Sequence, residues 1–325
     1  MGLAMRTPPA AGLRDVANRD VAPPRNLRAM TEFVVTLIAR PEDAADLAAA
    51  TAAIRAALPV SAETVLAKGI ATDLFFVTDE PLTDVRVGLQ SLVAGKALDI
   101  AVQPVAGRQK KLLVADMDST IIQQECLDEL ADYAGFKEKV SAITERAMRG
   151  ELDFEPALRE RVAMLAGLPE ATIDRVIAER IRLTPGAQTL VATMRAAGAR
   201  TILVSGGFTA FTGRVAAMVG FDENQANRLL ASEGKLTGTV AEPILGREAK
   251  VAALEEALSR LNLSADAAIA VGDGANDLDM LAHAGLGVAF HAKPKVAAAA
   301  DVRIQHNDLT ALLYLQGYAR DTFAA

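Results

Sequence analysis

The sequence predicts an α/β protein whose main body is a parallel sheet flanked by helices. Four apolar runs alternate with helical stretches in the manner of buried parallel strands; they cover 112–116, 201–205, 269–272 and 286–289. About eighty residues separate the first two runs, and helical periodicity extends over 126–179, which is too long for a simple crossover. Residues 229–240, interrupted by Gly234 and Gly238, have the pattern of a β-hairpin. We therefore expect a parallel-sheet core with an inserted helical cap.

The segment before this body has the pattern of a βαββαβ unit. The expected strands are 33–39, 64–67, 74–77 and 100–102, and the expected helices are 44–57 and 85–94. The unit holds no cluster of acids or histidines and no Gly-rich phosphate loop, so we expect it to serve regulation or association rather than chemistry. Residues 103–111 are polar and basic and are interpreted as a linker.

The first 30 residues are interpreted as a flexible extension. They contain five arginines and two Pro pairs but lack the continuous apolar stretch of a secretory signal. A transit peptide is an alternative that Asp15, Asp20 and the absence of Ser disfavour, and a start at Met30 is equally open.

Composition excludes several classes of partner. The net charge of −7 gives no electrostatic reason to bind nucleic acid or an anionic membrane, since both need concentrated Lys and Arg. No apolar run reaches the length of about 18 residues that a transmembrane helix needs. Cys126 is the only cysteine, so no disulfide can form within the chain, and a reducing, cytoplasmic compartment is compatible with this. We interpret Cys126 as a packing residue.

Two acids, Asp116 and Asp118, follow the first buried strand of the main body. In open parallel sheets, chemistry occurs at the carboxyl ends of the strands. An aspartate beside a bound cation can attack phosphorus, and a second carboxyl group two residues away can exchange protons with the leaving group and with water. The alternative is a solvated strand end without function, and the segments that follow decide against it.

Two of these segments are suited to holding a phosphoryl group. Ser205, Gly206 and Gly207 follow the second strand, where a hydroxyl group and glycine amides can bind phosphate. Lys250 lies near the start of a helix expected to run to about residue 261, and its ammonium can neutralise phosphoryl oxygens and a nucleophilic carboxylate. Alone, the first is explained as an ordinary strand-to-helix turn and the second as a solvated charge.

The last segment, residues 272–277, places two acids and an amide after another strand. Mg2+ prefers oxygen ligands and accepts few from protein. Asp273 can complete a coordination begun by Asp116, while Asp277 can orient ligands or water around the ion. A calcium-binding loop is the competing interpretation, but the twelve-residue spacing of ligands that ends in a Glu is missing.

In this order and spacing, the four segments resemble the haloacid dehalogenase-like phosphohydrolases over roughly residues 108–310. Glu125, the segments 152–155 and 158–162, and Gly206-Gly207-Phe208 after Ser205 are similar to the branch of that family that acts on phosphoserine. The resemblance implies a Rossmann-like core made of 108–124 and 182–325, and a helical cap made of 125–181. Separately, the βαββαβ layout of residues 31–107 resembles that of ACT-type regulatory domains.

The resemblance also implies a role for each matching residue. Asp116 is the expected nucleophile, and Asp118 the general acid and then base. The expected Mg2+ ligands are Asp116, the backbone carbonyl of Asp118, and Asp273, with Asp277 beside them. The remaining expected contacts bind the substrate: Ser205, Gly206 and Lys250 at the phosphoryl group, Asn276 on the metal-side loop, Glu125 at the ammonium, Arg161 at the carboxylate, and Met148, Phe154 and Gly207 around the pocket.

These roles predict hydrolysis of O-phosphoserine to serine and phosphate, the last step of serine biosynthesis, with serine as product or regulator and a homodimer as one expected assembly. Two alternatives remain within enzymes: transfer of the phosphoryl group to a hydroxyl acceptor such as homoserine, and hydrolysis of another small phosphomonoester. A third is an amino-acid-sensing binding protein without catalysis, against which the intact set of acids and Lys250 argues.

Overall fold

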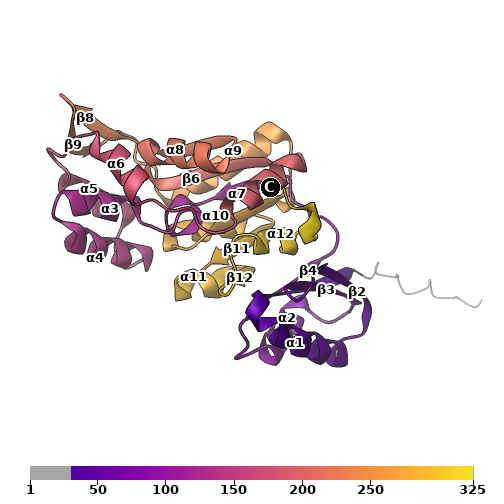
Figure 1. Cartoon of the computed structure of the whole chain (residues 1–325). Coiled ribbons are helices and arrows are strands. Elements are labelled where there is room, and N and C mark those ends of the chain that lie inside the picture. Colours follow the sequence, from indigo (N-terminus) through magenta and orange to yellow (C-terminus); the bar gives the residue numbers. More distant parts are fainter. Residues whose placement is uncertain (1–30, 325) are drawn as a thin grey trace, which may run out of the picture. The chain divides into compact units, whose positions relative to one another are not determined.

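The structure is a computed structural model that describes residues 31–324, so the predicted extension over residues 1–30 lies outside it. Its N-terminal part is an antiparallel sheet with two helices (Figure 1). The strands, in the order β2-β3-β1-β4, and the helices are β1 (Glu32–Ala39), α1 (Ala44–Ala57), β2 (Val60–Ala67), β3 (Ala71–Val77), α2 (Leu82–Leu92) and β4 (Leu98–Pro104). Val35 and Leu37 alternate along β1 and pack with Leu47 and Ile54 of α1. The predicted βαββαβ order is confirmed.

Six parallel strands form the main sheet, in the order β12-β11-β10-β5-β6-β7. They are β5 (Leu112–Ala115), β6 (Arg200–Phe208), β7 (Glu223–Asn227), β10 (Ala268–Gly272), β11 (Leu286–Phe290) and β12 (Val302–Ile304). The strands β5, β10 and β11 are apolar throughout because helices cover both faces of the sheet. On β5, Leu113 enters one core cluster while Leu112 and Val114 enter the other. The predicted parallel-sheet core is confirmed.

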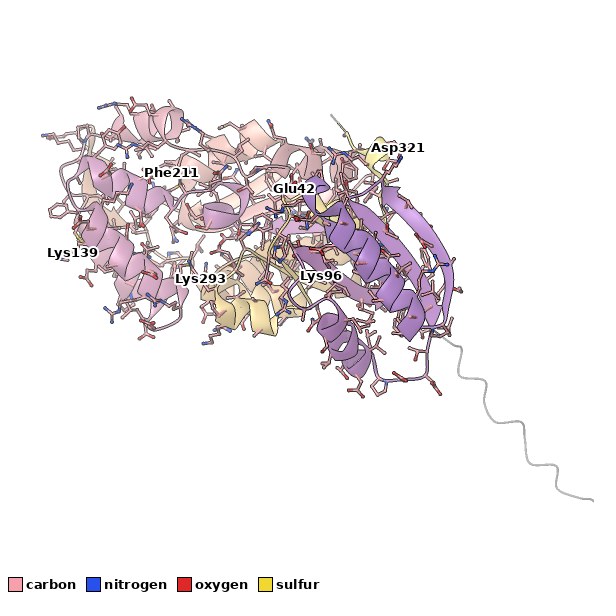
Figure 2. The ribbon with its side chains drawn as sticks, turned by 60° about the horizontal axis from the view of Figure 1, so that its bottom comes forward. Glu42, Lys96, Lys139, Phe211, Lys293 and Asp321 are labelled. Carbon is pink, nitrogen blue, oxygen red and sulfur yellow. The ribbon has the colours of Figure 1, made fainter. Side chains whose placement is uncertain are left out.

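The helices divide between these two faces. The cluster that contains Leu113 also includes α7 (Ala187–Ala196), α8 (Thr209–Val219) and α12 (Ala311–Leu315), and its largest side chains include the fully buried Phe211, labelled in Figure 2. The opposite cluster includes α9 (Arg247–Leu261), α10 (Leu278–His283) and α11 (Pro294–Ala299). Each loop that leaves a strand at its carboxyl end is thus held between two packed layers.

The long insertion after β5 is helical, as predicted. It contains α3 (Cys126–Tyr133), α4 (Lys137–Met148), α5 (Phe154–Ala163) and α6 (Thr172–Glu179), which lie with the hairpin β8 (Leu229–Ser232) and β9 (Lys235–Val240) in Figure 1. Gly238 on β9 permits the close approach to α5, because a Cβ there would come within 2.9 Å of the Ala166 Cβ. Cys126 is buried, in agreement with the packing role expected for it.

Two strands of the main sheet escaped prediction, and both lie at its edges. β7 has the sequence ENQAN and β12 has only three residues. Edge strands are less buried than central strands, so they can lack the apolar run by which a strand is recognised in the sequence. β6 is also longer than expected: it continues through Ser205, Gly206 and Gly207 to Phe208, which pairs with Asn227 after an irregularity in the register.

The segment interpreted as a linker, 103–111, connects β4 to β5, and three of its side chains, Gln103, Arg108 and Lys110, are buried. Arg108 is 8% exposed and donates two hydrogen bonds to Asp73, at 2.5 and 2.8 Å. It also donates to the carbonyls of Tyr314 and Leu315, at 3.0 and 2.8 Å. The Asp99 carboxylate accepts the backbone N–H groups of residues 305–307. The basic character of the segment therefore reflects buried contacts between the antiparallel sheet and the main body.

The sequence predicts no membrane-spanning helix. Within residues 31–324, no helix combines the length and the apolar character that crossing a bilayer requires.

Candidate active site

The strand order creates the site. β5 and β10 are neighbours in the sheet, although the chain leaves β5 toward β6 on its other side. This is the topological switch point at which open α/β sheets bind ligands. The pairing of Ala115 with Val271 places Asp116 beside the loop that begins at Gly272, and the Asp116 N–H donates to the Val271 carbonyl at 3.0 Å. Two acidic loops far apart in sequence therefore meet at one point.

Asp116 and Asp118 are held by a tight, irregular turn over Met117–Ile121, which is closed by a hydrogen bond from the Ile122 N–H to the Met117 carbonyl at 3.0 Å. The Met117 N–H donates to Asp116 Oδ1 at 2.8 Å, which fixes the carboxylate at the strand end. Asp118 Oδ1 accepts from the Cys126 N–H at 2.8 Å, and Oδ2 accepts from the Ser205 hydroxyl at 3.1 Å. Burial raises the pKa of Asp118 above its ordinary value, and the Cys126 and Ser205 donors oppose the rise only in part. Asp118 is therefore suited to carry a proton.

The segment from Ser205 to Gly207, predicted to bind phosphate, has little room for a side chain at either of its glycines. A Cβ at Gly206 would lie 2.9 Å from the ring of Phe154, and one at Gly207 would lie 3.0 Å from Asp118 Oδ2. The Gly207 N–H donates to the Ser205 hydroxyl at 2.8 Å, so it is engaged within the segment rather than free as the sequence suggested. The extension of β6 through this segment accounts for the difference, because the amides do not converge as they do at a helix start.

Lys250 and the loop after β10 complete the base of the site. Lys250 lies on the first turn of α9 and is 1% exposed; its Nζ is 2.6 Å from Asp116 Oδ1 and 2.6 Å from Asp277 Oδ1. Burial lowers the pKa of Lys250, but the carboxylates of Asp116 and Asp277 raise it by more, so it remains charged. Burial, followed by the charge of Asp277, raises the pKa of Asp116 well above its ordinary value and that of Asp273 to about 7.

The charge balance of this cluster fits a divalent cation. Asp116, Asp273 and Asp277 are buried and offer ligand oxygens within 4.8 Å of one another, while Lys250 supplies one positive charge at bonding distance. Asn276 Oδ1, on the same loop, is buried and has no hydrogen-bond partner among the described residues. Oxygen donors of this kind suit a hard cation such as Mg2+. Asp277, expected beside the metal, lies close enough to be a ligand itself.

A cavity of about 470 Å3 extends from Asp116 and Asp118 to the cap. Most of the residues predicted from the sequence line it: Asp116, Asp118, Glu125, Met148, Phe154, Arg161, Ser205, Gly206, Gly207 and Asn276. The other three, Lys250, Asp273 and Asp277, are buried beside Asp116 beneath the cavity. The structure thus brings all the predicted site residues together.

The cap supplies one half-buried carboxylate, that of Glu125, and one buried guanidinium, that of Arg161. Glu125 precedes α3, and its Oε1 accepts from the Ser119 hydroxyl at 2.6 Å. Burial, then the charge of Asp118, raises the pKa of Glu125 well above its ordinary value. Arg161 on α5 is 7% exposed; Nε donates to the Ala157 carbonyl at 3.1 Å and Nη1 to the Thr144 hydroxyl at 3.0 Å. Burial lowers the pKa of Arg161, and Glu125 and Asp128 oppose this.

Sequence reasoning assigned no role to several polar residues that support the site. Asn227 is buried, and its side chain donates to the carbonyls of Gly206 and Leu245 and accepts from the Leu245 N–H. Thr120 donates to Asp273 Oδ1 at 3.3 Å. The N–H of Lys293, labelled in Figure 2, donates to the Asp273 carbonyl at 3.1 Å. Thr120 lies in the Asp-Met-Asp-Ser-Thr motif, but nothing in the pattern around Asn227 marks it, because its partners are distant in sequence.

Comparison with known proteins assigns the family. A family model described as haloacid dehalogenase-like hydrolase matches residues 113–282, which contain the four acidic, hydroxyl and lysine segments. The chain belongs to the haloacid dehalogenase-like hydrolases. Among relatives in this family, phosphoserine phosphatase of Streptomyces coelicolor is 42% identical over 310 residues, 92% of this chain and 73% of that one.

Two solved structures of haloacid dehalogenase-like hydrolases are also similar. A family hydrolase of Salmonella enterica serovar Typhi has a TM-score of 0.78 at 30% identity, covering 89% of this chain and 99% of its own. A phosphoserine phosphatase described as a phospho-aspartyl intermediate analogue has a TM-score of 0.61 at 40% identity, covering 63% and 98%. The predicted family, fold class and enzyme class are confirmed.

Proposed function

We propose that the chain hydrolyses O-phosphoserine to serine and inorganic phosphate through an aspartyl-phosphate formed on Asp116. One observation carries the proposal: a single cavity is lined by two buried aspartates, Asp116 and Asp118, and also by the half-buried carboxylate of Glu125 and the buried guanidinium of Arg161. A phosphorylated zwitterionic amino acid has matching groups at its two ends. The similarity to curated phosphoserine phosphatases supports the same substrate.

In the first step, an Asp116 carboxylate oxygen attacks phosphorus and the bond from phosphorus to the serine oxygen breaks. Asp118 donates its proton to that oxygen, so serine leaves as the neutral alcohol. Lys250 holds Asp116 in place and offsets the negative charge that accumulates on the phosphoryl oxygens. Ser205, which already contacts Asp118, is positioned to donate to one of those oxygens.

In the second step, Asp118 takes a proton from a water molecule, whose oxygen attacks the phosphorus of the aspartyl-phosphate. The bond from phosphorus to Asp116 breaks, and inorganic phosphate and the free carboxylate result. The raised pKa of Asp118 suits both roles, since a group that gains and loses a proton in turn works best when its pKa approaches the working pH.

Asp116 and Asp273 would hold Mg2+, together with the backbone carbonyl of Asp118 and with Asp277 beside them. When bound, the ion supplies a positive charge that polarises the phosphoryl group and offsets the charge of the clustered acids. Asn276, whose Oδ1 has no partner in residues 31–324, is suited to bind the substrate or ion-bound water from the same loop.

At the cap, Glu125 would meet the substrate ammonium and Arg161 its carboxylate. Arg161 Nη2 bonds to no other group of the described residues, so it is left for a ligand. Phe154 and Met148 close the cavity around the carbon atoms between these groups. Fixed charges of both signs reject phosphate esters that lack either the ammonium or the carboxylate.

These residues provide the kinds of catalytic contribution that a reaction with a high barrier requires. Hydrolysis of a phosphate monoester needs a barrier reduction of more than about 20 kcal/mol. Orientation of the reactants contributes about 7–11 kcal/mol, and each positioned donor contributes about 3–4 kcal/mol. The cavity offers several donors and a charged base, so no single group has to supply the whole effect.

A phosphate-release assay over phosphorylated amino acids and sugars, with Mg2+ or EDTA, tests the proposal. We expect the highest kcat/KM for O-phosphoserine, dependence on Mg2+, and loss of turnover in Asp116→Asn with the fold intact by circular dichroism. A folded Asp116→Asn variant with full activity would disprove the nucleophile assignment. Preference for another ester, or release of a phosphorylated acceptor instead of phosphate, would contradict the substrate or the reaction class.

The remaining assignments belong to the same proposal. Residues 31–107 form an ACT-like regulatory or dimerising domain, 108–124 with 182–325 the catalytic core, and 125–181 the cap. The site of action is cytoplasmic, in keeping with a lone, buried thiol. Serine inhibition of the full chain and its mass in solution test the role of the N-terminal domain.

A further inference from the structure

Thr144, on the cap helix α4, connects two charged residues of the cavity wall. Its hydroxyl oxygen lies 2.7 Å from Asp128 Oδ1 on α3 and 3.0 Å from Arg161 Nη1 on α5. All three side chains are at least nine-tenths buried, and Thr144 and Arg161 line the cavity. One hydroxyl group thus links three helices of the cap at the wall of the cavity.

The direction of these hydrogen bonds follows from the chemistry of the groups. A guanidinium can only donate, so Arg161 donates to a lone pair of the Thr144 oxygen. The hydroxyl has a single proton, and of its two acceptors the Asp128 carboxylate is nearer than the Val140 carbonyl, at 2.7 against 3.1 Å. Asp128 therefore orients the hydroxyl so that its lone pair faces Arg161.

This arrangement fixes the plane of the guanidinium. Nε is held by the Ala157 carbonyl and Nη1 by Thr144, and two anchors on a rigid planar group leave no free rotation. Nη2 remains for a ligand. No carboxylate of residues 31–324 lies within ion-pair distance of Arg161, although the charges of Glu125, Asp128 and Asp118 act on it from further away. The guanidinium can therefore accept the direct contact of a ligand carboxylate.

We propose that Thr144 is a positioning residue that, oriented by Asp128, sets Arg161 for the carboxylate of the substrate and thereby determines affinity for phosphorylated amino acids. The inference rests on the proposed function, because Arg161 needs a carboxylate to act upon. It assigns to Thr144 no contact with the substrate and no part in the steps at phosphorus.

Two nearly isosteric substitutions separate positioning from packing. Thr144→Val keeps the methyl group and the volume but removes the hydroxyl, whereas Thr144→Ser keeps the hydroxyl and removes the methyl group. A hydrogen bond to a charged group has a large effect, so we expect Thr144→Val to raise KM for O-phosphoserine about 10-fold and to change kcat by less than about threefold. We expect Thr144→Ser to retain the KM of the parent protein.

The same variants are assayed with p-nitrophenyl phosphate, which has no carboxylate, and with inorganic phosphate as a competing product. Both should behave as with the parent protein, while Arg161→Ala gives the upper limit of the effect on O-phosphoserine. Equal losses on both substrates, or a Thr144→Ser variant as impaired as Thr144→Val, would overturn the inference. If the parent protein itself fails to hydrolyse O-phosphoserine, it is the proposed function that fails.

Discussion

Replacing Asp118 by Asn separates the two proton transfers from the attack on phosphorus. Asn has nearly the same shape, its Oδ1 can accept from the Cys126 N–H, and its amide can donate to the Ser205 hydroxyl. Both contacts of Asp118 therefore have a replacement, and we expect the free energy of unfolding to change by no more than about 1 kcal/mol. The variant can no longer give or take a proton.

The expected effect on rate depends on the leaving group. General acid and base catalysis contributes about 100-fold to 10,000-fold, or about 3–5 kcal/mol at 1.36 kcal/mol per factor of ten. With O-phosphoserine, the poor leaving group needs the proton, so the first step slows by this factor. With p-nitrophenyl phosphate, the leaving group departs as a stable anion, so the first step proceeds and only hydrolysis of the aspartyl-phosphate is slow.

Rapid mixing with p-nitrophenyl phosphate checks this reasoning. We expect the Asp118→Asn variant to release a burst of about one nitrophenolate per active site, followed by slow turnover, and mass spectrometry to find one phosphoryl group on Asp116. The Asp116→Asn variant is the matched control and should give neither burst nor adduct. Equal rate losses on both substrates, with no burst, would refute the assignment of Asp118.

The remaining predictions concern the support of the site and its charge. Asn227→Ala should lower the free energy of unfolding by about 2–4 kcal/mol, measured with denaturant, since three hydrogen bonds that hold Gly206 and Leu245 are lost. Unlike Thr144→Val, this variant should lose activity equally on O-phosphoserine and p-nitrophenyl phosphate. Unequal losses on the two substrates would contradict the prediction. Burial raises the pKa of Asp273 from its ordinary value to about 7, so in EDTA the proton favours the fold, and this contribution to stability declines as the pH rises from about 4 to about 7. Mg2+ favours the ionised form, so its increase of Tm in a thermal scan should be larger at about pH 8 than at about pH 5, and an equal increase would count against the metal site.

Sequence patterns predicted those parts of the fold in which local and global preferences agree. The helix 44–57 has the expected bounds, and the four central strands of the main sheet are short apolar runs that need both faces covered. β7 and β12 were not predicted, because polar or very short edge strands form by pairing with the adjacent strand and carry no strand pattern of their own. The buried contacts of Arg108 could not be predicted, because its partners, Asp73 and Leu315, are far away in the sequence.

The site was predictable to the extent that each loop carries its own motif. Asp116, Lys250 and Asp273 stand in short patterns, and the parallel topology brings them together without further information. The state of Gly207 was not predictable, since its N–H bonds to Ser205 through an irregular extension of β6. Thr144 and Asn227 lie outside any motif, and only the packing of the cap and of β7 assigns them partners.

The junction around Arg108 limits how the chain can be shortened in the laboratory. A fragment that began after residue 107 would keep the Arg108 guanidinium but lose its partner, the Asp73 carboxylate. It would also lose the hydrogen bond that the Gln103 side chain donates to the Leu315 carbonyl. Arg108 and the carbonyls of Tyr314 and Leu315, at the end of α12, would then face water on the side where Asp73 and Gln103 had been. Low stability or low solubility of such a fragment would result from this newly exposed surface. It would not show what the antiparallel sheet does in the intact protein.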